Sequence, residues 1–422
     1  MNAAPPVLVI VGASYAGAQL AASARDAGFD GRILLIGDET RAPYQRPPLS
    51  KGLLTGKTQV DALALKADDF YRESGIELLT GHRVTALDTA GRVVVLDDGR
   101  RLGYDWLALT TGARCRPLTL PGAHLAGVFE LRSLGDALAL DAAARNARRA
   151  CVIGGGFIGL EVASALATRG LQVSVVEAAP RLLARAVTPE LSDFVAALHR
   201  RHGVDIHCGQ GVRALIGQAD RVTAVELQDG ESIACDLVVA GIGVLPNTGL
   251  AERAGIACAN GILTDALGQT SAPRVLAAGD CAAFPNPYAA DPAAPIRLES
   301  IQAANDLARA AASLVAGQPQ PYAAVPWFWS DQYDAKLQMA GLMAADDEVV
   351  VRGDIASGRF SLFCLRGGRI ASVHAVSRPA DHMLGRKLVA ARCAATPAQL
   401  ADEGFDLKSL LAVQACNSCN AQ

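Results

Sequence analysis

The chain has 422 residues and a formal net charge of −3, and 51% of its residues are hydrophobic. Its length predicts about two or three domains, and a charge this close to neutral gives no reason to expect nucleic acid or a membrane surface as a partner. Its apolar runs fall short of the roughly 18 residues that a membrane-spanning helix needs. We therefore expect a soluble, cytoplasmic, globular protein.

Most of the ten cysteines stand alone in the sequence, as Cys151, Cys208 and Cys235 do. Isolated cysteines are typical of small buried side chains in a reducing compartment, whereas a secreted disulfide framework shows closely spaced sets. Cys416 and Cys419 form a C-x-x-C pair near the end of the chain, and residues 1–114 contain no cysteine.

One pattern occurs twice, in residues 7–39 and 150–178. Each copy begins with an apolar run, bends at a glycine cluster, continues with small and apolar residues at helical spacing and returns to an apolar run beside an acid. This pattern predicts strand, turn, helix and strand, the core of a dinucleotide-binding fold. Two such units in one chain indicate one bound flavin dinucleotide and one exchanging nicotinamide dinucleotide.

The first glycine cluster is "GASYAG". Gly12 permits a tight turn, and Gly17 lets the helix and the strand approach closely. Ser14 is small enough to leave the helix N-terminus open to a pyrophosphate. Asp38 and Glu39 follow the second strand, where a carboxylate can accept hydrogen bonds from ribose hydroxyls.

Residues 43–51, "PYQRPPLSK", combine an aromatic ring, three prolines and two cations. Prolines remove backbone donors, so the stretch should be a stiff loop rather than part of a helix or a central strand. We expect a short helix around residues 68–75, followed by hairpin-like strands with turns at residues 90–91 and 98–99.

The second cluster, "GGGFIGLE", has the full spacing with Gly154, Gly156 and Gly159. Glu177 ends the following strand, where a carboxylate accepts the ribose hydroxyls of NAD and repels the additional phosphate of NADP, which favours NADH. Two arginines that could soften this preference follow: Arg181 and Arg185. A corresponding meander should lie after the second unit.

Later segments complete the pattern. "RVLAAGDCA" (274–282) predicts a strand that runs into Gly279 and Asp280. Beyond about Pro326 the alternating segments indicate the antiparallel strands of a third domain.

Two basic clusters, 145–149 and 199–202, fit solvated helix faces or a docking site for an acidic partner, and the sequence does not distinguish the two.

Together these motifs resemble the two-dinucleotide flavoproteins of glutathione reductase type, and more narrowly the ferredoxin reductases that serve bacterial cytochrome P450s and ring-hydroxylating dioxygenases. The resemblance spans about residues 6–411 and rests on "GASYAG", "PYQRPPLSK", "LRSLGDA", "GGGFIGLE", "TSAPRVLAAGD" and "VPWFWSDQ". It implies an α/β fold with two Rossmann-like domains and a C-terminal α+β domain with an antiparallel sheet. The implied boundaries are 1–113 and 246–325 for the FAD-binding domain, 114–245 for the NAD-binding domain, 326–411 for the C-terminal domain and 412–422 for a tail.

The resemblance also implies roles for individual residues. Lys51 should lie near the reactive edge of the flavin, pair with Glu161 and stabilise negative charge on the reduced ring. Trp329 should lie where electrons leave for the partner, whereas Trp327 is expected to pack in the core. Asp280 should lie at a helix start facing FAD, although an aspartate there could simply be a helix cap.

The remaining expected cofactor contacts match the family's motifs position by position. For FAD they are Gly12, Ser14, Ala16, Gly17, Asp38, Arg46, Pro48, Lys51, Val84, Arg132, Gly279, Asp280, Ile301 and Trp329. For NAD they are Gly154, Gly156, Ile158, Gly159, Glu161, Glu177 and Gly243. No metal site is expected.

The absence of a cysteine pair near the first loop implies that electrons leave the flavin directly. A flavin can release them singly, which suits a [2Fe–2S] ferredoxin as the acceptor and an oxygenase behind it. We expect the enzyme to be a monomer or weak dimer that uses FAD and NADH.

Three alternatives remain open. The acceptor could be a rubredoxin; the pair Cys416 and Cys419 could make the protein a flavin–dithiol reductase; or the protein could be a redox-dependent interaction protein that resembles apoptosis-inducing factor. The tail could also hold half of a metal site, or it could be a terminus whose cysteines do no chemistry.

Overall fold

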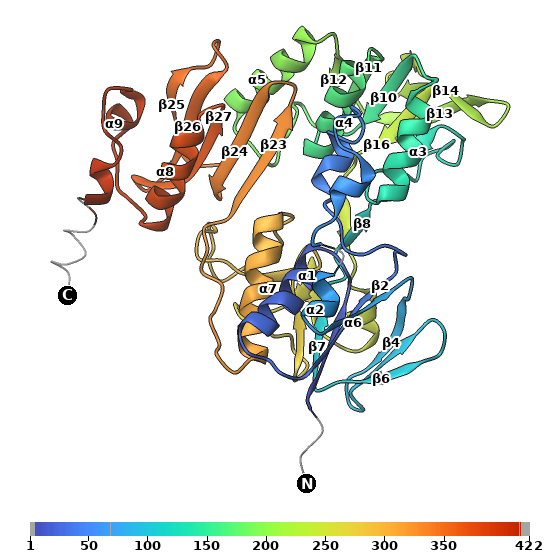
Figure 1. Cartoon of the computed structure of the whole chain (residues 1–422). Coiled ribbons are helices and arrows are strands. Elements are labelled where there is room, and N and C mark those ends of the chain that lie inside the picture. Colours follow the sequence, from blue (N-terminus) through green and yellow to red (C-terminus); the bar gives the residue numbers. More distant parts are fainter. Residues whose placement is uncertain (1–4, 68, 413, 415–422) are drawn as a thin grey trace. The chain divides into compact units, whose positions relative to one another are not determined.

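A computed structural model of the chain describes residues 5–67, 69–412 and 414. The chain divides into two compact units, each built from separate stretches of sequence (Figure 1). The first unit comprises residues 5–45, 63–114 and 245–328, and the second comprises residues 46–62, 115–244 and 329–412. Residues 46–62, which include most of the proline-rich loop, therefore belong with the second unit. The finer three-domain boundaries given above remain a prediction.

The first unit is built on a parallel sheet in the order β20-β7-β1-β2-β3. These strands are Val275–Ala277, Trp106–Leu109, Val7–Val11, Arg32–Gly37 and Ile76–Thr80. The four strands other than the edge strand β3 are almost entirely apolar, as expected of strands that are covered on both faces. Helix α1 (Tyr15–Asp26) packs on α7 (Ile301–Val315) in this unit (Figure 1).

An antiparallel meander of β4 (Val84–Asp88), β5 (Val93–Leu96) and β6 (Arg101–Gly103) confirms the predicted hairpins. A four-stranded sheet follows in the order β18-β19-β21-β22, with strands Cys258–Ala259, Gly261–Leu263, Ala282–Pro285 and Pro295–Ile296. The short helices are α2 (Phe70–Glu73) and α6 (Gly249–Arg253), and β8 (Ala113–Cys115) and β17 (Val244–Pro246) mark where the chain passes between units.

The second unit contains a second parallel sheet in the order β12-β11-β10-β16-β9. Its strands are Asp205–Cys208, Gln172–Glu177, Arg149–Ile153, Leu237–Ala240 and Val128–Phe129, and its helices are α3 (Leu134–Ala144), α4 (Phe157–Thr168) and α5 (Pro189–Arg201). The predicted second meander is β13 (Val212–Gln218), β14 (Arg221–Leu227) and β15 (Ser232–Ala234). The repeat seen in the sequence is therefore a repeat of structure.

The C-terminal part of this unit is an antiparallel sheet in the order β23-β24-β27-β26-β25, against which α8 packs (Figure 1). The elements are β23 (Trp327–Gln332), β24 (Ala335–Gly341), β25 (Glu348–Asp354), β26 (Arg359–Arg366), β27 (Arg369–Val376), α8 (Pro379–Ala390) and α9 (Pro397–Ala401). Two short 3₁₀ helices, η1 (Pro47–Ser50) and η2 (Val60–Leu63), lie in the proline-rich region and just after it. The predicted fold class is confirmed.

In the described part of the chain, the structure has no helix that is both long and apolar enough to cross a lipid bilayer. Cys416 and Cys419 lie outside the described residues.

Candidate functional site

The first glycine turn joins β1 to α1 in the first unit. Gly12 has a φ of 116°, and a Cβ there would lie 2.1 Å from the carbonyl oxygen of Thr110. A Cβ on Gly17 would lie 2.1 Å from the carbonyl oxygen of Gly12. Both positions therefore require glycine. Ser14 has extended backbone at the N-cap of α1, so the first turn of that helix has the form of an anion-binding N-terminus.

The later segment "RVLAAGDCA" (274–282) reaches this turn. Gly279 has a φ of 83°, and a Cβ there would lie 3.0 Å from the Cβ of Ala16 on α1. Asp280 follows in the tight turn between β20 and β21. The prediction that Asp280 starts a helix is wrong, as is its alternative role as a helix cap. The chain continues directly into β21, and α7 begins only at Ile301.

The acids that follow β2 occupy a different place from the acid that ends β11. Val11 is paired with Ile36, and Ile153 is paired with Val176, so Gly37 in the first repeat corresponds to Glu177 in the second. A Cβ on Gly37 would lie 2.6 Å from the Cβ of Ala13.

Because Ala13 fills this space, the acids of the first repeat come one and two residues later. Asp38 lies 3.0 Å from Arg83 at the surface, and the hydroxyl of Tyr44 donates to Glu39 over 2.6 Å. Val84, also expected to contact FAD, is the first residue of β4.

The second glycine turn, between β10 and α4, repeats the first. Gly154 has a φ of 109°, and a Cβ there would lie 2.4 Å from the carbonyl oxygen of Gly241. A Cβ on Gly159 would lie 2.2 Å from the carbonyl oxygen of Gly154. Gly156 is the N-cap of α4, and a Cβ there would have no described protein atom within 4 Å. The space beside Gly156 is therefore open to a ligand.

Glu177 is held against this turn. One carboxylate oxygen accepts the N–H of Gly155 at 2.6 Å, and the other accepts the N–H of Ala179 at 2.7 Å. A carboxylate offers about four lone-pair sites, so it retains capacity for two ribose hydroxyls. Arg181 donates to the carbonyl oxygens of Val187 and Ala184 at 2.9 and 2.8 Å, so hydrogen bonds to the backbone hold its guanidinium.

The other expected NAD contacts lie in the same unit. Ile158 is 48% exposed in the first turn of α4, which is unusual for so large an apolar side chain. Gly243 has a φ of 96° in the segment between β16 and β17. Both flank the carboxyl end of the parallel sheet, where open α/β sheets bind their ligands.

The proline-rich loop places Lys51 against α4. The ammonium nitrogen of Lys51 lies 2.7 Å from the Oε2 atom of Glu161, so the predicted ion pair is present. The hydroxyl of Ser50 donates to the same oxygen at 2.6 Å, and the hydroxyl of Ser330 donates to Oε1 at 2.6 Å. The side chain of Glu161 is 2% exposed, so three donors hold a buried carboxylate. Neither Ser50 nor Ser330 was predicted from the sequence, although each adjoins a predicted site residue.

Other predicted FAD contacts also fall in the second unit. Arg46 donates to the carbonyl oxygen of Arg132 at 2.7 Å, which brings the proline-rich loop to the "LRSLGDA" segment. Pro48 lies in η1, and Trp329 is half-buried in β23, immediately before Ser330. Trp327, at the start of the same strand, is also only half-buried.

Both basic clusters are mostly solvated, as expected, but each departs from a solvated helix face in one respect. Residues 145–149 lie after the end of α3 and at the start of β10, not on a helix. In the second cluster, His199 is fully buried on α5, and its Nε2 atom lies 2.8 Å from Oε1 of Gln332. Burial lowers the pKa of His199 to about 4, so it is neutral at pH 7.

The cysteines that the structure describes are free thiols: Cys115, Cys151, Cys208, Cys235, Cys258, Cys281, Cys364 and Cys393. Burial raises the pKa of each of them. For Cys364 the value is about 11 and for Cys235 about 12. Because the thiolate is the reactive form, these cysteines are poor redox nucleophiles at neutral pH.

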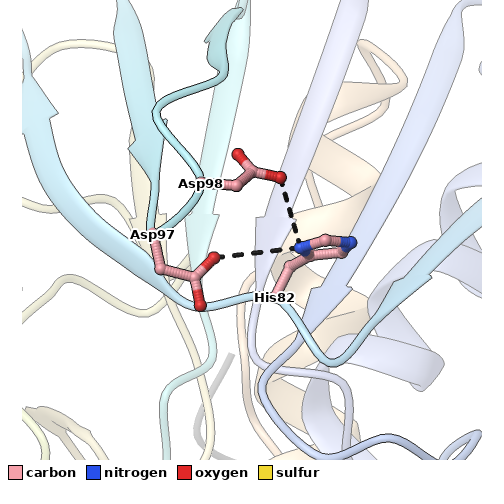
Figure 2. Close-up of side chains that lie close together, drawn as sticks. All are labelled: His82, Asp97 and Asp98. Atoms are coloured by element: carbon pink, nitrogen blue, oxygen red, sulfur yellow. Dashed lines mark ion pairs between the residues drawn. The ribbon is translucent and has the colours of Figure 1, made fainter.

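One group of side chains has the composition of a metal site. The Nδ1 atom of His82 lies 3.8 Å from Asp97 and 3.5 Å from Asp98 (Figure 2). However, Arg100 contacts Asp98 at 2.7 Å and the Nε2 atom of His82 at 2.9 Å. The guanidinium already supplies positive charge to this half-exposed group, and we assign no metal to it.

Two dinucleotide-type turns and an ion pair between Lys51 and the buried Glu161 define a flavin- and nicotinamide-dependent oxidoreductase. Residues 6–341 match the family model for pyridine nucleotide-disulphide oxidoreductases, and residues 327–411 match the reductase C-terminal model. The chain belongs to the pyridine nucleotide-disulphide oxidoreductase family.

Within that family, ferredoxin reductases are similar to it along nearly their whole length. Rhodocoxin reductase of Rhodococcus erythropolis is 44% identical over 405 residues, covering 96% of this chain and 94% of that protein. The ferredoxin reductase for the CYP199A2 system of Rhodopseudomonas palustris is 43% identical, with a TM-score of 0.93 and coverage of 96% and 99%. The covalent putidaredoxin reductase–putidaredoxin complex gives 39% identity, a TM-score of 0.94 and coverage of 98% and 100%.

Proposed function

We propose that this chain is an NADH-dependent ferredoxin reductase: it takes a hydride from NADH onto bound FAD and passes the electrons singly to a [2Fe–2S] ferredoxin that serves a cytochrome P450 or a ring-hydroxylating dioxygenase. The observation that supports this most strongly is the ion pair between Lys51 and the buried Glu161, at 2.7 Å. It joins the proline-rich loop to the helix that begins at the second glycine turn.

The first unit fits the dinucleotide part of FAD. Gly12 and Gly17 lack the Cβ atoms that would overlap the backbone, and Gly279 closes against Ala16 on the same helix. FAD binding is assigned in this unit to Gly12, Ser14, Ala16, Gly17, Asp38, Val84, Gly279, Asp280 and Ile301. In the second unit it is assigned to Arg46, Pro48, Lys51, Arg132 and Trp329. Bound FAD supplies hydride acceptance and single-electron release.

The second glycine turn fits NADH. The open space beside Gly156 admits a pyrophosphate at the N-terminus of α4, and Glu177 presents its carboxylate next to the turn. NADH binding is assigned to Gly154, Gly156, Ile158, Gly159, Glu161, Glu177 and Gly243. Glu177 disfavours the 2′-phosphate of NADPH by repulsion between like charges.

Lys51 and Trp329 have distinct roles in the proposal. The ammonium of Lys51 stabilises negative charge that accumulates on the reduced cofactor and helps to orient the nicotinamide. Trp329, half-buried next to Ser330, lies where electrons leave for the ferredoxin.

The raised pKa values of the described cysteines favour an acceptor outside the chain. Free thiols throughout the described chain also support work in the reducing cytoplasm.

The test combines purified holoenzyme, NADH and putidaredoxin as the probe ferredoxin, with cytochrome c as the final acceptor. The proposal predicts NADH-dependent cytochrome c reduction that requires the ferredoxin, and much slower reduction with NADPH. Rapid NADH-dependent bleaching of the flavin without reduction of putidaredoxin or other [2Fe–2S] ferredoxins would contradict it, and reduction of rubredoxin alone would favour the rubredoxin alternative.

A further inference from the structure

Glu161 joins three segments that are distant in sequence. Ser50 and Lys51 come from the proline-rich loop, Glu161 from α4, and Ser330 from the first strand of the C-terminal sheet. The Oε2 atom of Glu161 receives both Ser50 and Lys51, whereas Oε1 receives Ser330. Among the residues that the structure describes, Ser330 is the donor on which Oε1 depends.

A directed chain of hydrogen bonds fixes the hydroxyl of Ser330. The amide nitrogen of Gln332 donates to the Oγ atom of Ser330 at 3.2 Å, so the hydroxyl proton points away from Gln332 and toward Glu161. The amide oxygen of Gln332 is thereby left to accept from the Nε2 atom of His199 at 2.8 Å. Because burial lowers the pKa of His199, the ring is neutral and its single proton lies on Nε2. Every bond in this chain is donated toward the carboxylate, and such chains strengthen their members.

The strand that bears Ser330 is itself fixed to α4 one turn further on. The backbone N–H of Tyr333 donates to the Oγ atom of Ser164 at 3.0 Å. Ser164 follows Glu161 by three residues, so the two side chains lie on one face of the helix. Ser330 therefore has little freedom to move away from the carboxylate.

We propose that Ser330 is a positioning residue for hydride transfer, acting through Glu161 to hold the ammonium of Lys51 in place. The inference rests on the proposed function. The terminal torsion of a glutamate is broad, so an unopposed carboxylate turns easily. Without Ser330, the buried Oε1 atom has lost its donor, so the carboxylate turns from its present orientation and its Oε2 atom moves away from the ammonium of Lys51.

Two variants separate this role from a loss of stability. Ser330→Ala removes the hydroxyl in question. Ser361→Ala removes an equivalent bond in the same sheet, because the hydroxyl of Ser361 donates to the carboxylate of Asp381 at 2.8 Å. Gln332→Met keeps the side-chain length but removes the amide. It should speed acetylation of Lys51 and slow flavin bleaching, as Ser330→Ala does, but to a smaller extent.

The first readout is acetylation of lysines in the holoenzyme by an N-hydroxysuccinimide ester, mapped by mass spectrometry. Lys51 should react about three to ten times faster in Ser330→Ala than in the wild type, because the carboxylate no longer holds its amine. Lys57, which is exposed, should react equally in every variant. An unchanged rate at Lys51 would overturn the inference.

The second readout is the rate of flavin bleaching at saturating NADH in a stopped-flow experiment. Ser330→Ala should slow it about tenfold to a hundredfold, with the NADH dissociation constant changed less than about threefold. Ser361→Ala should remain within about twofold of wild type. Equal slowing in both variants would show a merely structural role.

A double variant completes the test. If Ser330 acts through Lys51, then Lys51→Met combined with Ser330→Ala should be no slower than Lys51→Met alone. Additive slowing would contradict the inference. If NADH fails to bleach the wild-type flavin, the proposed function fails, while the acetylation experiment still shows whether Ser330 holds Lys51.

Discussion

The ion pair between Lys51 and Glu161 is asymmetric in its exposure. The two charged atoms are 2.7 Å apart, but the side chain of Lys51 is 20% exposed and that of Glu161 only 2%. The buried carboxylate therefore stabilises a cation that reaches a more open region. Such a pair presents positive charge to a bound ligand, whereas two equally buried partners would neutralise each other within the protein interior.

Replacing either partner should slow flavin reduction. We expect Lys51→Met and Glu161→Gln each to lower the stopped-flow rate about tenfold to a hundredfold, because a cation near developing negative charge contributes on the order of 2–3 kcal/mol. Lys51→Met should also lower the free energy of unfolding by about 1–3 kcal/mol, since it leaves a buried carboxylate without its counter-charge. Lys57→Met, in the same region but exposed, is the control and should match the wild type.

Gly156 offers a test that separates ligand binding from folding. A Cβ there has no described protein atom within 4 Å, so Gly156→Ala should fold and bind FAD normally. It should nevertheless raise the KM for NADH at least about tenfold, because the added methyl occupies the approach of the pyrophosphate to the helix N-terminus. Gly103→Ala, which also adds a methyl with little around it, should change neither quantity. A normal KM in Gly156→Ala would move the NADH site elsewhere.

Glu177 should govern the choice between NADH and NADPH. Glu177→Ala removes the carboxylate that faces the glycine turn, so we expect the KM for NADH to rise about tenfold, as for the loss of a hydrogen bond to a charged group. Discrimination against NADPH should fall by a similar factor as the repulsion is lost.

Steady-state kinetics with both nucleotides measures the two effects of Glu177→Ala. Arg181→Ala should leave the ratio of kcat/KM for NADH to that for NADPH unchanged, because the guanidinium of Arg181 is hydrogen-bonded to the backbone oxygens of Ala184 and Val187. A marked loss of NADPH turnover in that variant would instead give Arg181 a role in cofactor choice.

Short-range patterns allowed much of this structure to be predicted. Strand, glycine turn and helix are set by neighbouring residues, so both dinucleotide units and their essential glycines were recognisable in the sequence. The pairing of Lys51 with Glu161 was predicted only through the family resemblance, because nothing local links a loop lysine to a distant helix. Ser330 and His199 were missed for the same reason: their function depends on partners from other segments.

Two features, the misplaced helix start at Asp280 and the position of the acids in the first repeat, have a definite physical origin. The segment after Asp280 is rich in alanine and equally compatible with a helix, but pairing of Ile262 with Ala282 draws it into a strand. Similarly, the position of the acid in the first repeat depends on Ala13, whose side chain leaves room only for glycine at position 37. Both outcomes are decided by contacts with non-adjacent chain.

Stability should fall as the pH drops below neutral. Burial lowers the pKa of His199 and of His374 to about 4 from the ordinary value of 6.5. Between these values the unfolded chain binds a proton that the folded chain does not, so the free energy of unfolding decreases by up to about 1.4 kcal/mol per pH unit for each histidine. The stability associated with keeping each buried histidine neutral is fully present above about pH 6.5 and is lost toward pH 4.

Urea unfolding at pH 7, 6 and 5 measures this decrease. His199→Gln keeps a donor near Gln332 but cannot be protonated, and it should flatten the dependence by roughly half of the combined effect of the two histidines. His124→Gln, at an exposed position, should leave the dependence unchanged. An equally steep dependence in His199→Gln would show that His199 is not a source of the loss.

Electron counting decides whether the C-terminal cysteines take part in the reaction. In an anaerobic titration with NADH, we expect the flavin to bleach fully at about two electrons per FAD, because the described cysteines all have raised pKa values and are poor redox nucleophiles. Replacing Cys416 and Cys419 together by serine should then leave ferredoxin reduction within about twofold of wild type. Uptake of about four electrons, reduced to two in the double variant, would instead show a working dithiol in the tail. The natural acceptor would then have to be sought among disulfides rather than ferredoxins.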